Sequence, residues 1–327
     1  MRTKIVYVLV SSGNDIYIEQ AYMSIWSCKY YNPDATIVLA TDSATKQHLD
    51  KYIAMKGLIS EFVIHEFNPD VSNFERSRFL KTSLRSIIEG DFLFVDTDTI
   101  FCDTIKEIDG IISDIAMVEN LHIPTLESSP YKNTIYKRLS DFFNIKPNKD
   151  CAYYNSGVIY SKDSQVSSDF YNAWHKNWSI SKFNPGGIYD QASLLKTVLE
   201  YPDYVHPLGG IYNVQISASI KYLYSGKIIH FFNVNLMKNV IHPFLDKKYY
   251  VKIKQYGDLS EDVKDDIINC KSLFFVPTCV VGPENAAYWN SSACIALNNI
   301  QNYKIIAHIT NAILRVTNKV INIFSHK

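Results

Sequence analysis

Runs of consecutive apolar residues recur along the first 120 positions and alternate with segments of helical periodicity. The runs cover residues 5–10, 36–40, 62–65, 92–95 and 115–118. Apolar runs of this length are typical of strands buried on both faces, as in parallel sheets. Residues 17–30 can form a helix between the first two runs, ending before Asn32 and Pro33. This order predicts an α/β fold with a mostly parallel sheet flanked by helices.

Two carboxylates interrupt the apolar sequence directly after the fourth run, at Asp96 and Asp98. Side chains alternate along an extended chain, so both point to one side, with Cα atoms about 7 Å apart, and repel each other. Ligands of parallel sheets bind at the carboxyl ends of strands, which is where this pair lies. Three interpretations are open: a solvated turn, a phosphatase of the haloacid dehalogenase type with Asp96 as nucleophile and Asp98 as acid or base, and a metal clamp for a diphosphate.

The surrounding sequence favours the metal clamp. Ile100 and Phe101 continue the apolar sequence, which disfavours a solvated turn. The phosphatase motif belongs to the first strand of its fold, whereas several strands and helices are predicted before Asp96. A divalent cation would remove the repulsion between the carboxylates and keep coordination positions open for phosphate oxygens.

A segment rich in cations, residues 74–88, directly precedes the acidic strand. Apolar side chains form one helical stripe in this segment, and Arg78, Lys81 and Arg85 form a second at steps of three and four. A cationic stripe therefore directly precedes the acidic end of the strand. For Arg85, a solvated surface position is an equal alternative.

Composition and charge exclude several classes of protein. The chain has 327 residues, of which 47% are hydrophobic, and its 33 Lys and Arg balance 33 Asp and Glu. We therefore expect a globular protein without the overall positive field that attracts nucleic acid. We recognise no secretion signal and no apolar run long enough to span a membrane, which predicts a cytoplasmic protein. The six cysteines lack zinc-site spacing and are expected to be reduced.

The composition of the sequence changes after residue 245, where segments rich in charged residues become frequent. We predict a domain of residues 1–245 and a small helical appendage of residues 246–327. Residues 304–327 place six apolar side chains on one helical face and contain four Lys and Arg but no acid. Such a helix can lie on the anionic inner face of a membrane, or it can pack on the body as an ordinary terminal helix.

Four ordered motifs resemble those of nucleotide-sugar glycosyltransferases with the Rossmann-like GT-A fold, and are most similar to family 8, which includes glycogenin and bacterial lipopolysaccharide enzymes. The resemblance covers residues 4–245. It implies a metal-dependent hexosyltransferase that moves glucose or galactose from a UDP-sugar to a saccharide or glycolipid acceptor, in the synthesis of bacterial surface glycans. The motifs are Asp96-Thr97-Asp98, Asn155-Ser156-Gly157, Asp190-Gln191 and Ile229-His230-Phe231-Phe232.

The resemblance implies a metal site formed by Asp96, Asp98 and His230, which would hold Mn²⁺ or Mg²⁺ against the donor diphosphate. His230 has a second interpretation, as a histidine that ends a core strand. The family's usual Gly and Lys-Pro-Trp do not follow His230. We therefore do not assign to Lys238 the phosphate-binding role of the family's lysine.

The resemblance also implies a donor-sugar pocket lined by Asn155 and Ser156, with Gly157 allowing a ligand to approach the backbone. Asp190 and Gln191 are implied to act beside the anomeric carbon. Asp190 would bind sugar hydroxyls, and the side-chain carbonyl of Gln191 would support the developing positive charge. An aspartate at a helix start can also serve as a cap.

The nucleotide is implied to contact residues from three segments. Arg76 is an alternative to Arg78 because the register of the helix is open, and Tyr17 could stack on uracil. The implied contacts are Ser11, Tyr17, Arg78, Lys81 and Thr97.

Three questions stay open at this level. No free-standing base is recognised on an acceptor side, which favours transfer with retention over inversion. Residues 120–148 are predicted to form a lid or acceptor segment, because acceptor specificity lies in variable loops. A non-catalytic nucleotide-sugar or glycan-binding protein on the same fold is the alternative to an enzyme.

Overall fold

The computed structural model describes residues 1–129, 131–146, 151–219, 221–232, 242–272, 291–301 and 303–325. The chain divides into two compact units, one of Met1–Ser129 with Thr134–Phe275 and one of Pro130–Asn133 with Val276–Lys327. Lys238 lies outside the described residues, as do residues 130, 147 and 148 of the predicted acceptor segment.

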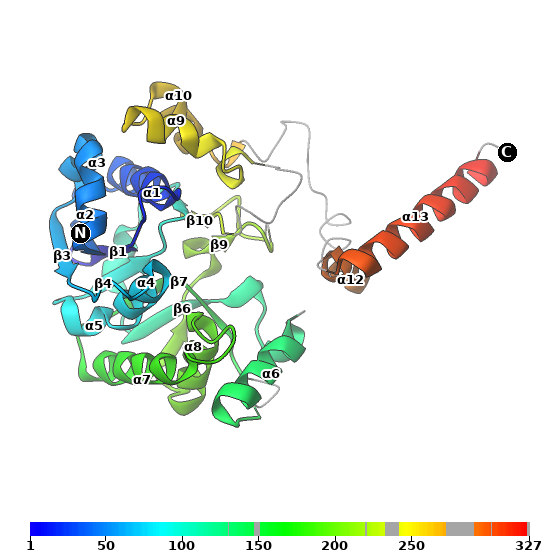
Figure 1. The fold of residues 1–327 in the computed structure, drawn as a ribbon, viewed down its shortest axis with the longest axis horizontal. Helices are drawn as coiled ribbons and strands as arrows, with labels where there is room; N and C mark the ends of the chain where they lie inside the picture. The colour runs from blue at the N-terminus through cyan, green and yellow to red at the C-terminus, as the bar shows by residue number, and fades with distance from the viewer. Residues whose placement is uncertain are drawn as a thin grey trace. The chain divides into compact units, whose positions relative to one another are not determined.

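The first unit contains a seven-stranded sheet with the strand order β3-β2-β1-β4-β7-β6-β8 (Figure 1). Neighbouring strands are parallel except at β7, which is antiparallel to both β4 and β6. A smaller sheet pairs β5 with β10 and β10 with β9. The strands are β1 (Lys4–Leu9), β2 (Ile37–Asp42), β3 (Glu61–His65), β4 (Phe92–Val95), β5 (Thr99–Phe101), β6 (Ile115–Glu119), β7 (Tyr154–Ser161), β8 (Val205–Pro207), β9 (Val214–Gln215) and β10 (Ile228–His230).

Helices cover both faces of the large sheet, because successive side chains of a buried strand point to opposite faces. Ile5 and Tyr7 of β1 pack in one core with α1, α9 and α10, whereas Val6 and Val8 pack in a second core with α4, α5, α7 and α8. The helices are α1 (Tyr17–Tyr31), α2 (Ser43–His48), α3 (Ile53–Leu58), α4 (Asn73–Thr82), α5 (Leu84–Ile87), α6 (Lys132–Phe143), α7 (Gln165–Ser181), α8 (Asp190–Glu200), α9 (Tyr249–Tyr256) and α10 (Glu261–Ile268).

This architecture confirms the predicted α/β class with a mostly parallel sheet flanked by helices. All five predicted strands and the predicted helix after β1 are present, with ends that differ from prediction by at most two residues. The antiparallel strand β7 was not predicted. Its apolar run begins only after Gly157, so it lacks the continuous pattern of the other central strands.

The compact first unit includes the segment that follows residue 245. Tyr250 and Ile253 of α9 and Val263 and Ile267 of α10 are buried in the same core as alternate residues of β1. The predicted appendage was to begin at residue 246, whereas this unit extends to Phe275. The charged side chains that suggested a boundary belong to the outer faces of two amphipathic helices.

In the second unit, α12 (Ser292–Gln301) and α13 (Lys304–Ser325) contact each other. Ile305, Ile309, Ile313 and Val316 of α13 are each at least 57% exposed. Among the described residues, no helix combines the length and apolarity needed to cross a membrane. Among the described residues, Cys28, Cys102, Cys270 and Cys294 are free thiols.

Candidate metal centre

Asp96 and Asp98 lie where the chain leaves the main sheet, between the end of β4 and the start of β5 in the smaller sheet. The backbone N–H of Asp96 donates to the carbonyl of Gly157 on β7, at 2.8 Å. The N–H of Phe231 donates to the carbonyl of Asp98, also at 2.8 Å. Both sheets therefore hold the backbone of the acidic pair in place.

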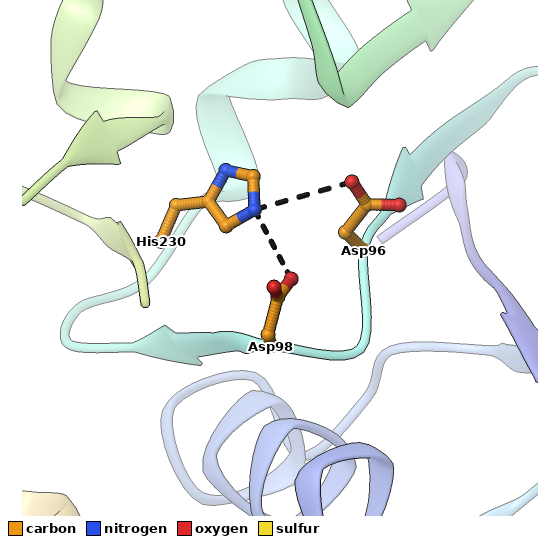
Figure 2. A group of neighbouring side chains, drawn as sticks. All are labelled: Asp96, Asp98 and His230. Carbon is orange, nitrogen blue, oxygen red and sulfur yellow. Dashed lines mark ion pairs between the residues drawn. The ribbon is translucent and has the colours of Figure 1, made fainter. Parts of the chain in front are cut away.

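His230 is brought to the acidic pair by the antiparallel pairing of β10 with β5, in which it lies opposite Thr99. Its Nε2 atom is 3.0 Å from Asp98 Oδ1 and 3.9 Å from Asp96 Oδ2 (Figure 2). The His230 side chain is buried, and the two carboxylates are each about one quarter exposed. The cluster is therefore open to solvent on the carboxylate side.

The donor atoms of Asp96, Asp98 and His230 fit one divalent cation. One ligand atom from each residue lies within 4.8 Å of the others. Adjacent ligands of an octahedral ion at about 2.1 Å lie about 3 Å apart and opposite ligands about 4.2 Å apart, so the spacing suits such an ion after small movements. Two carboxylates and one imidazole leave further positions for water or phosphate oxygens.

The charges of the cluster change three pKa values. Removal from water and the nearby Asp98 raise the pKa of Asp96, against the opposing effect of Lys81 and His230. Removal from water would also raise the pKa of Asp98, but His230 outweighs it, and the pKa is lowered. For His230, removal from water acts to lower the pKa, yet Asp98 and Asp96 raise it. The site thus favours a positive charge between the carboxylates.

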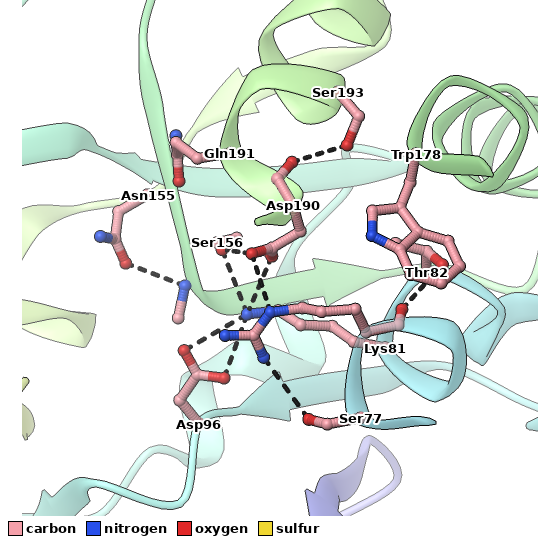
Figure 3. A network of polar contacts seen from close by, with 12 residues as sticks. Ser77, Lys81, Thr82, Asp96, Asn155, Ser156, Trp178, Asp190, Gln191 and Ser193 are labelled. Atoms are coloured by element: carbon pink, nitrogen blue, oxygen red, sulfur yellow. Dashed lines mark hydrogen bonds and ion pairs between the residues drawn. The ribbon is translucent and has the colours of Figure 1, made fainter. Parts of the chain in front are cut away.

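Lys81, on α4, forms the second positive element of the site. Its amine lies 3.1 Å from Asp96 Oδ1 and 3.3 Å from Asp190 Oδ2, and it donates to the Ser156 hydroxyl at 3.1 Å (Figure 3). The side chain is only 3% exposed. Lys81 therefore acts as the internal counter-charge that joins two carboxylates from different elements.

Asp190 is the first residue of α8 and faces α4. Arg78 Nε lies 3.2 Å from its Oδ1 atom, and the Ser156 hydroxyl donates to Oδ2 at 3.0 Å. Removal from water would raise the pKa of Asp190, but Lys81 and Arg78 outweigh it and hold this pKa well below its usual range. The N-cap position is Tyr189, without a side-chain cap. The Asp190 carboxylate therefore belongs to the cationic cluster.

Gln191 and Asn155 lie beside this cluster but bond elsewhere. The Gln191 amide donates to the carbonyl of Tyr154 at 2.6 Å. The Asn155 amide donates to Asn120 Oδ1 at 3.1 Å. In Figure 3 both side chains lie apart from the group formed by Lys81 and Asp190. The antiparallel direction of β7 places Asn155 near this edge of the sheet, because the start of β7 lies beside the end of β4.

The three residues implied to bind the nucleotide from the β1 and β4 ends differ in exposure. Ser11 is buried, and its hydroxyl donates to Asp15 Oδ1 at 2.6 Å, so it organises the loop after β1. Tyr17 is 48% exposed, and partial removal from water, followed by Asp15, raises the pKa of its hydroxyl. Thr97 lines the same small cavity as Asp98.

The register of α4 gives Arg76 and Arg78 different partners. Arg76 forms a buried ion pair with Asp42 at 2.9 Å and donates to three backbone carbonyls between residues 68 and 71. Arg85 is also buried and donates to the carbonyls of Gly90 and Ile88, so the alternative of a solvated position for it is wrong. Of the predicted cationic stripe, Arg78 and Lys81 face the acidic residues.

Two residues that sequence reasoning missed complete the surroundings of the site. Asn213, which precedes β9, contacts His230 Nδ1 through its Oδ1 atom at 3.0 Å. Lys254 of α9 donates to the carbonyl of Gly13 at 3.0 Å and to that of Asp15 in the loop after β1. The only sequence signal for Lys254 is its place on the polar face of an amphipathic helix.

Comparisons with known proteins add little to this geometry. No protein-family model matches the sequence, and no curated protein matches it. Among solved structures, the apo form of mouse xyloside xylosyltransferase 1 aligns with 70% of this chain and 97% of that chain, at 14% sequence identity and a TM-score of 0.46. A likeness this distant does not indicate an activity, so any functional inference rests on the geometry of the site.

Proposed function

We propose that the protein is a metal-dependent hexosyltransferase with a GT-A-like fold that transfers glucose or galactose from a UDP-sugar to a saccharide or glycolipid acceptor. The observation that carries the proposal is the Asp96, Asp98 and His230 cluster, which offers three metal ligands directly beside two cations of α4. It lies at the carboxyl end of β4 in a mostly parallel sheet, the usual ligand position of such folds.

The bound ion, Mn²⁺ or Mg²⁺, would supply a Lewis acid that stabilises the leaving diphosphate. Arg78 is 24% exposed and Lys81 only 3%, so Arg78 is placed to contact the diphosphate. Lys81 keeps the pKa of Asp190 low, so that this carboxylate stays ionised and can accept hydrogen bonds from hydroxyl groups of the donor sugar. Tyr17, with its exposed ring, would stack on the base.

Transfer with retention remains part of the proposal, with Gln191 beside the anomeric carbon. Its amide donates to the backbone carbonyl of Tyr154, which orients the side chain, and its side-chain carbonyl would support the developing positive charge. Asn155 and Ser156 would line the donor side. The segment of residues 120–148, of which 120–129 and 131–146 are described, would form the acceptor side. An assignment to family 8 and a role in bacterial surface-glycan synthesis belong to the same proposal.

We also propose a peripheral contact of α13 with the anionic inner surface of a membrane, in a protein otherwise located in the cytoplasm. Four apolar side chains on one face of the helix are at least 57% exposed. Residues 304–327 contain four Lys and Arg and no acid. An exposed apolar face combined with positive charge is the pattern of helices that bind in the interface plane.

The test is release of UDP from UDP-glucose and UDP-galactose with and without Mn²⁺. We expect Mn²⁺-dependent release by the natural chain and a loss of at least about 100-fold in the Asp98→Asn variant, because a carboxylate ligand is removed. Asp50→Asn, which changes a 72% exposed carboxylate away from the cluster, is the matched control. No release by the natural chain would overturn the proposal. Turnover of simple phosphate esters would instead support the phosphatase alternative, and UDP-sugar binding without turnover the non-catalytic one.

A further inference from the structure

His230 has a partner on each ring nitrogen. Nε2 faces the two carboxylates, and Nδ1 lies 3.0 Å from Oδ1 of Asn213. His230 is 3% exposed and Asn213 is fully buried. An imidazole nitrogen beside a buried amide must either donate to its oxygen or accept from its nitrogen, so the orientation of the Asn213 amide decides which nitrogen of His230 carries a proton.

The orientation of the Asn213 amide follows from the backbone N–H of Gly157, which can only donate a hydrogen bond. The N–H of Gly157 lies 2.8 Å from one side-chain atom of Asn155, which must therefore be the oxygen Oδ1. The Asn213 amide approaches the same oxygen at 2.9 Å, so its donor end, Nδ2, points to Asn155. The oxygen of Asn213 then points to His230 Nδ1. An oxygen can only accept, so Nδ1 carries the proton.

We propose that Asn213, oriented by Asn155 and the backbone N–H of Gly157, is a positioning residue that holds His230 as the Nδ1–H tautomer with the Nε2 lone pair directed at the metal. This inference rests on the metal centre of the proposed function. Metal-bound histidines generally donate their second N–H to such a partner, which sets both the tautomer and the ring orientation.

The close packing of Gly157 supports the same arrangement. A Cβ atom at this position would lie 2.3 Å from His230 Cε1, 2.7 Å from His230 Nδ1 and 2.9 Å from Asn155 Oδ1. These distances are far below van der Waals contact, so the bare backbone of Gly157 is the surface on which the imidazole rests. The glycine of the Asn-Ser-Gly motif is thus required by the histidine, in addition to any ligand.

The motif consequently serves both halves of the site. Asn155 and Gly157 act on His230, whereas Ser156 bonds Lys81 and Asp190. Both ends of the Asn155 amide are engaged, since Oδ1 accepts from Gly157 and Asn213 and Nδ2 donates to Asn120. The main role of Asn155 is therefore to support the metal ligand His230. Only its remaining side-chain N–H is available to contact a sugar.

The experiment measures binding of Mn²⁺ alone, by the electron paramagnetic resonance signal of the free ion. Asn213→Ala removes the acceptor, and we expect a Kd 10- to 100-fold higher than that of the natural chain. Asn213→Asp keeps an acceptor for Nδ1 but loses the bond to Asn155, so it should recover most of the affinity even though it folds less stably. The control is Asn177→Ala, which removes a different buried asparagine, located on α7. It should leave the affinity for Mn²⁺ unchanged.

A second readout reports the tautomer itself. In Mg²⁺-saturated protein labelled with ¹⁵N-histidine, a proton on Nδ1 of His230 is expected in the natural chain and in Asn213→Asp. Natural affinity in a folded Asn213→Ala variant, or a proton on Nε2 in the natural chain, would overturn the inference, as would absence of Mn²⁺ binding. Mn²⁺ binding that depends on Asn213 without UDP-sugar turnover would overturn the proposed function alone.

Discussion

The Lys81 amine lies 3.3 Å from Asp190 Oδ2, and both side chains are less than 10% exposed. The same amine is 3.1 Å from Asp96, so one lysine forms ion pairs with two carboxylates and offsets part of their negative charge. Loss of one partner of such a buried group costs far more than loss of a surface pair, because the remaining charges stay desolvated.

We therefore expect Lys81→Met to lower the free energy of unfolding by about 3–5 kcal/mol in urea titrations. The double variant Lys81→Met/Asp190→Asn should lose less than Lys81→Met alone, since it removes one unpaired charge. Lys137→Met, which breaks an exposed pair with Asp141, should change stability by less than about 1 kcal/mol. Equal stability of Lys81→Met and the natural chain would contradict this account.

Metal binding is expected to stabilise the fold, because a cation removes the repulsion between Asp96 and Asp98. At 100 times the Kd, Mn²⁺ should add about 2.7 kcal/mol and raise the Tm, whereas Asp98→Asn should show no Mn²⁺-dependent shift. Hydrogen exchange should slow on Mn²⁺ addition at the amides around Asp98. An equal Tm shift in Asp98→Asn would show that Mn²⁺ binds elsewhere, and Asp50→Asn is the control for loss of a surface carboxylate.

Two buried histidines outside the metal centre predict a stability that falls in mild acid. Removal from water lowers the pKa of His122 and of His242 to about 4, and each accepts a backbone N–H, from Gln215 and from Phe244. In the unfolded chain the pKa is about 6.5, so the unfolded state takes up protons first as the pH falls. The stabilisation is complete above pH 6.5 and is lost towards pH 4.

Each of these histidines is expected to reduce the free energy of unfolding by up to about 3 kcal/mol between pH 6.5 and pH 4. Urea titrations at a series of pH values would measure this. His122→Gln and His242→Gln should each flatten the dependence. A slope unchanged in both variants would assign the acid sensitivity to other groups.

Lys254 is expected to affect nucleotide binding from outside the sheet. Its amine holds the carbonyls of Gly13 and Asp15 and lies 3.8 Å from the buried Glu19. Lys254→Met should loosen the loop after β1 and weaken UDP binding several-fold, as measured by calorimetry. Lys252→Met, on the same helix but 69% exposed, should bind UDP normally. Identical UDP affinity in the two variants would exclude a role for Lys254.

The apolar face of α13 gives a prediction about lipid binding. Ile309→Asp places a charge on that face and should reduce co-sedimentation with vesicles that contain anionic lipid by at least about 10-fold, because a charge resists burial in the interface. Asn311→Asp adds the same charge on the opposite face and should have a smaller effect. Equal effects would indicate attraction by charge alone, and no effect in either would end the proposal of a membrane contact.

The sequence predicts elements whose pattern is local. Strand β4 and the carboxylates after it can be recognised because four apolar residues end abruptly at Asp96. The strands β9 and β10 have two and three residues, too few for any periodicity. The pairing of β10 with β5 is what brings His230 to Asp98. The histidine could be proposed from a family motif, whereas its partner Asn213 has no signal of that kind.

The sequence pattern also fails to predict which charged residues are buried and which partners they have. Arg76, Arg78 and Arg85 are alike in sequence, yet one pairs with Asp42, one faces the site and one bonds backbone carbonyls near Gly90. The carbonyls near Gly90 lie within five residues of Arg85, whereas Arg76 and Arg78 depend on carboxylates supplied by distant segments. The same holds for Lys254, whose acceptors lie in a loop near the start of the chain.

The bond from Lys254 to Gly13 joins residues 241 positions apart in the chain. During synthesis, the strands β1, β2 and β4 leave the ribosome long before α9 exists. The loop after β1 must therefore wait for most of the chain before it is held in place, and the acidic pair must wait for His230. A nascent chain that ends between β4 and His230 contains β1, β2 and β4, but the acidic pair still lacks its histidine and the loop after β1 still lacks Lys254.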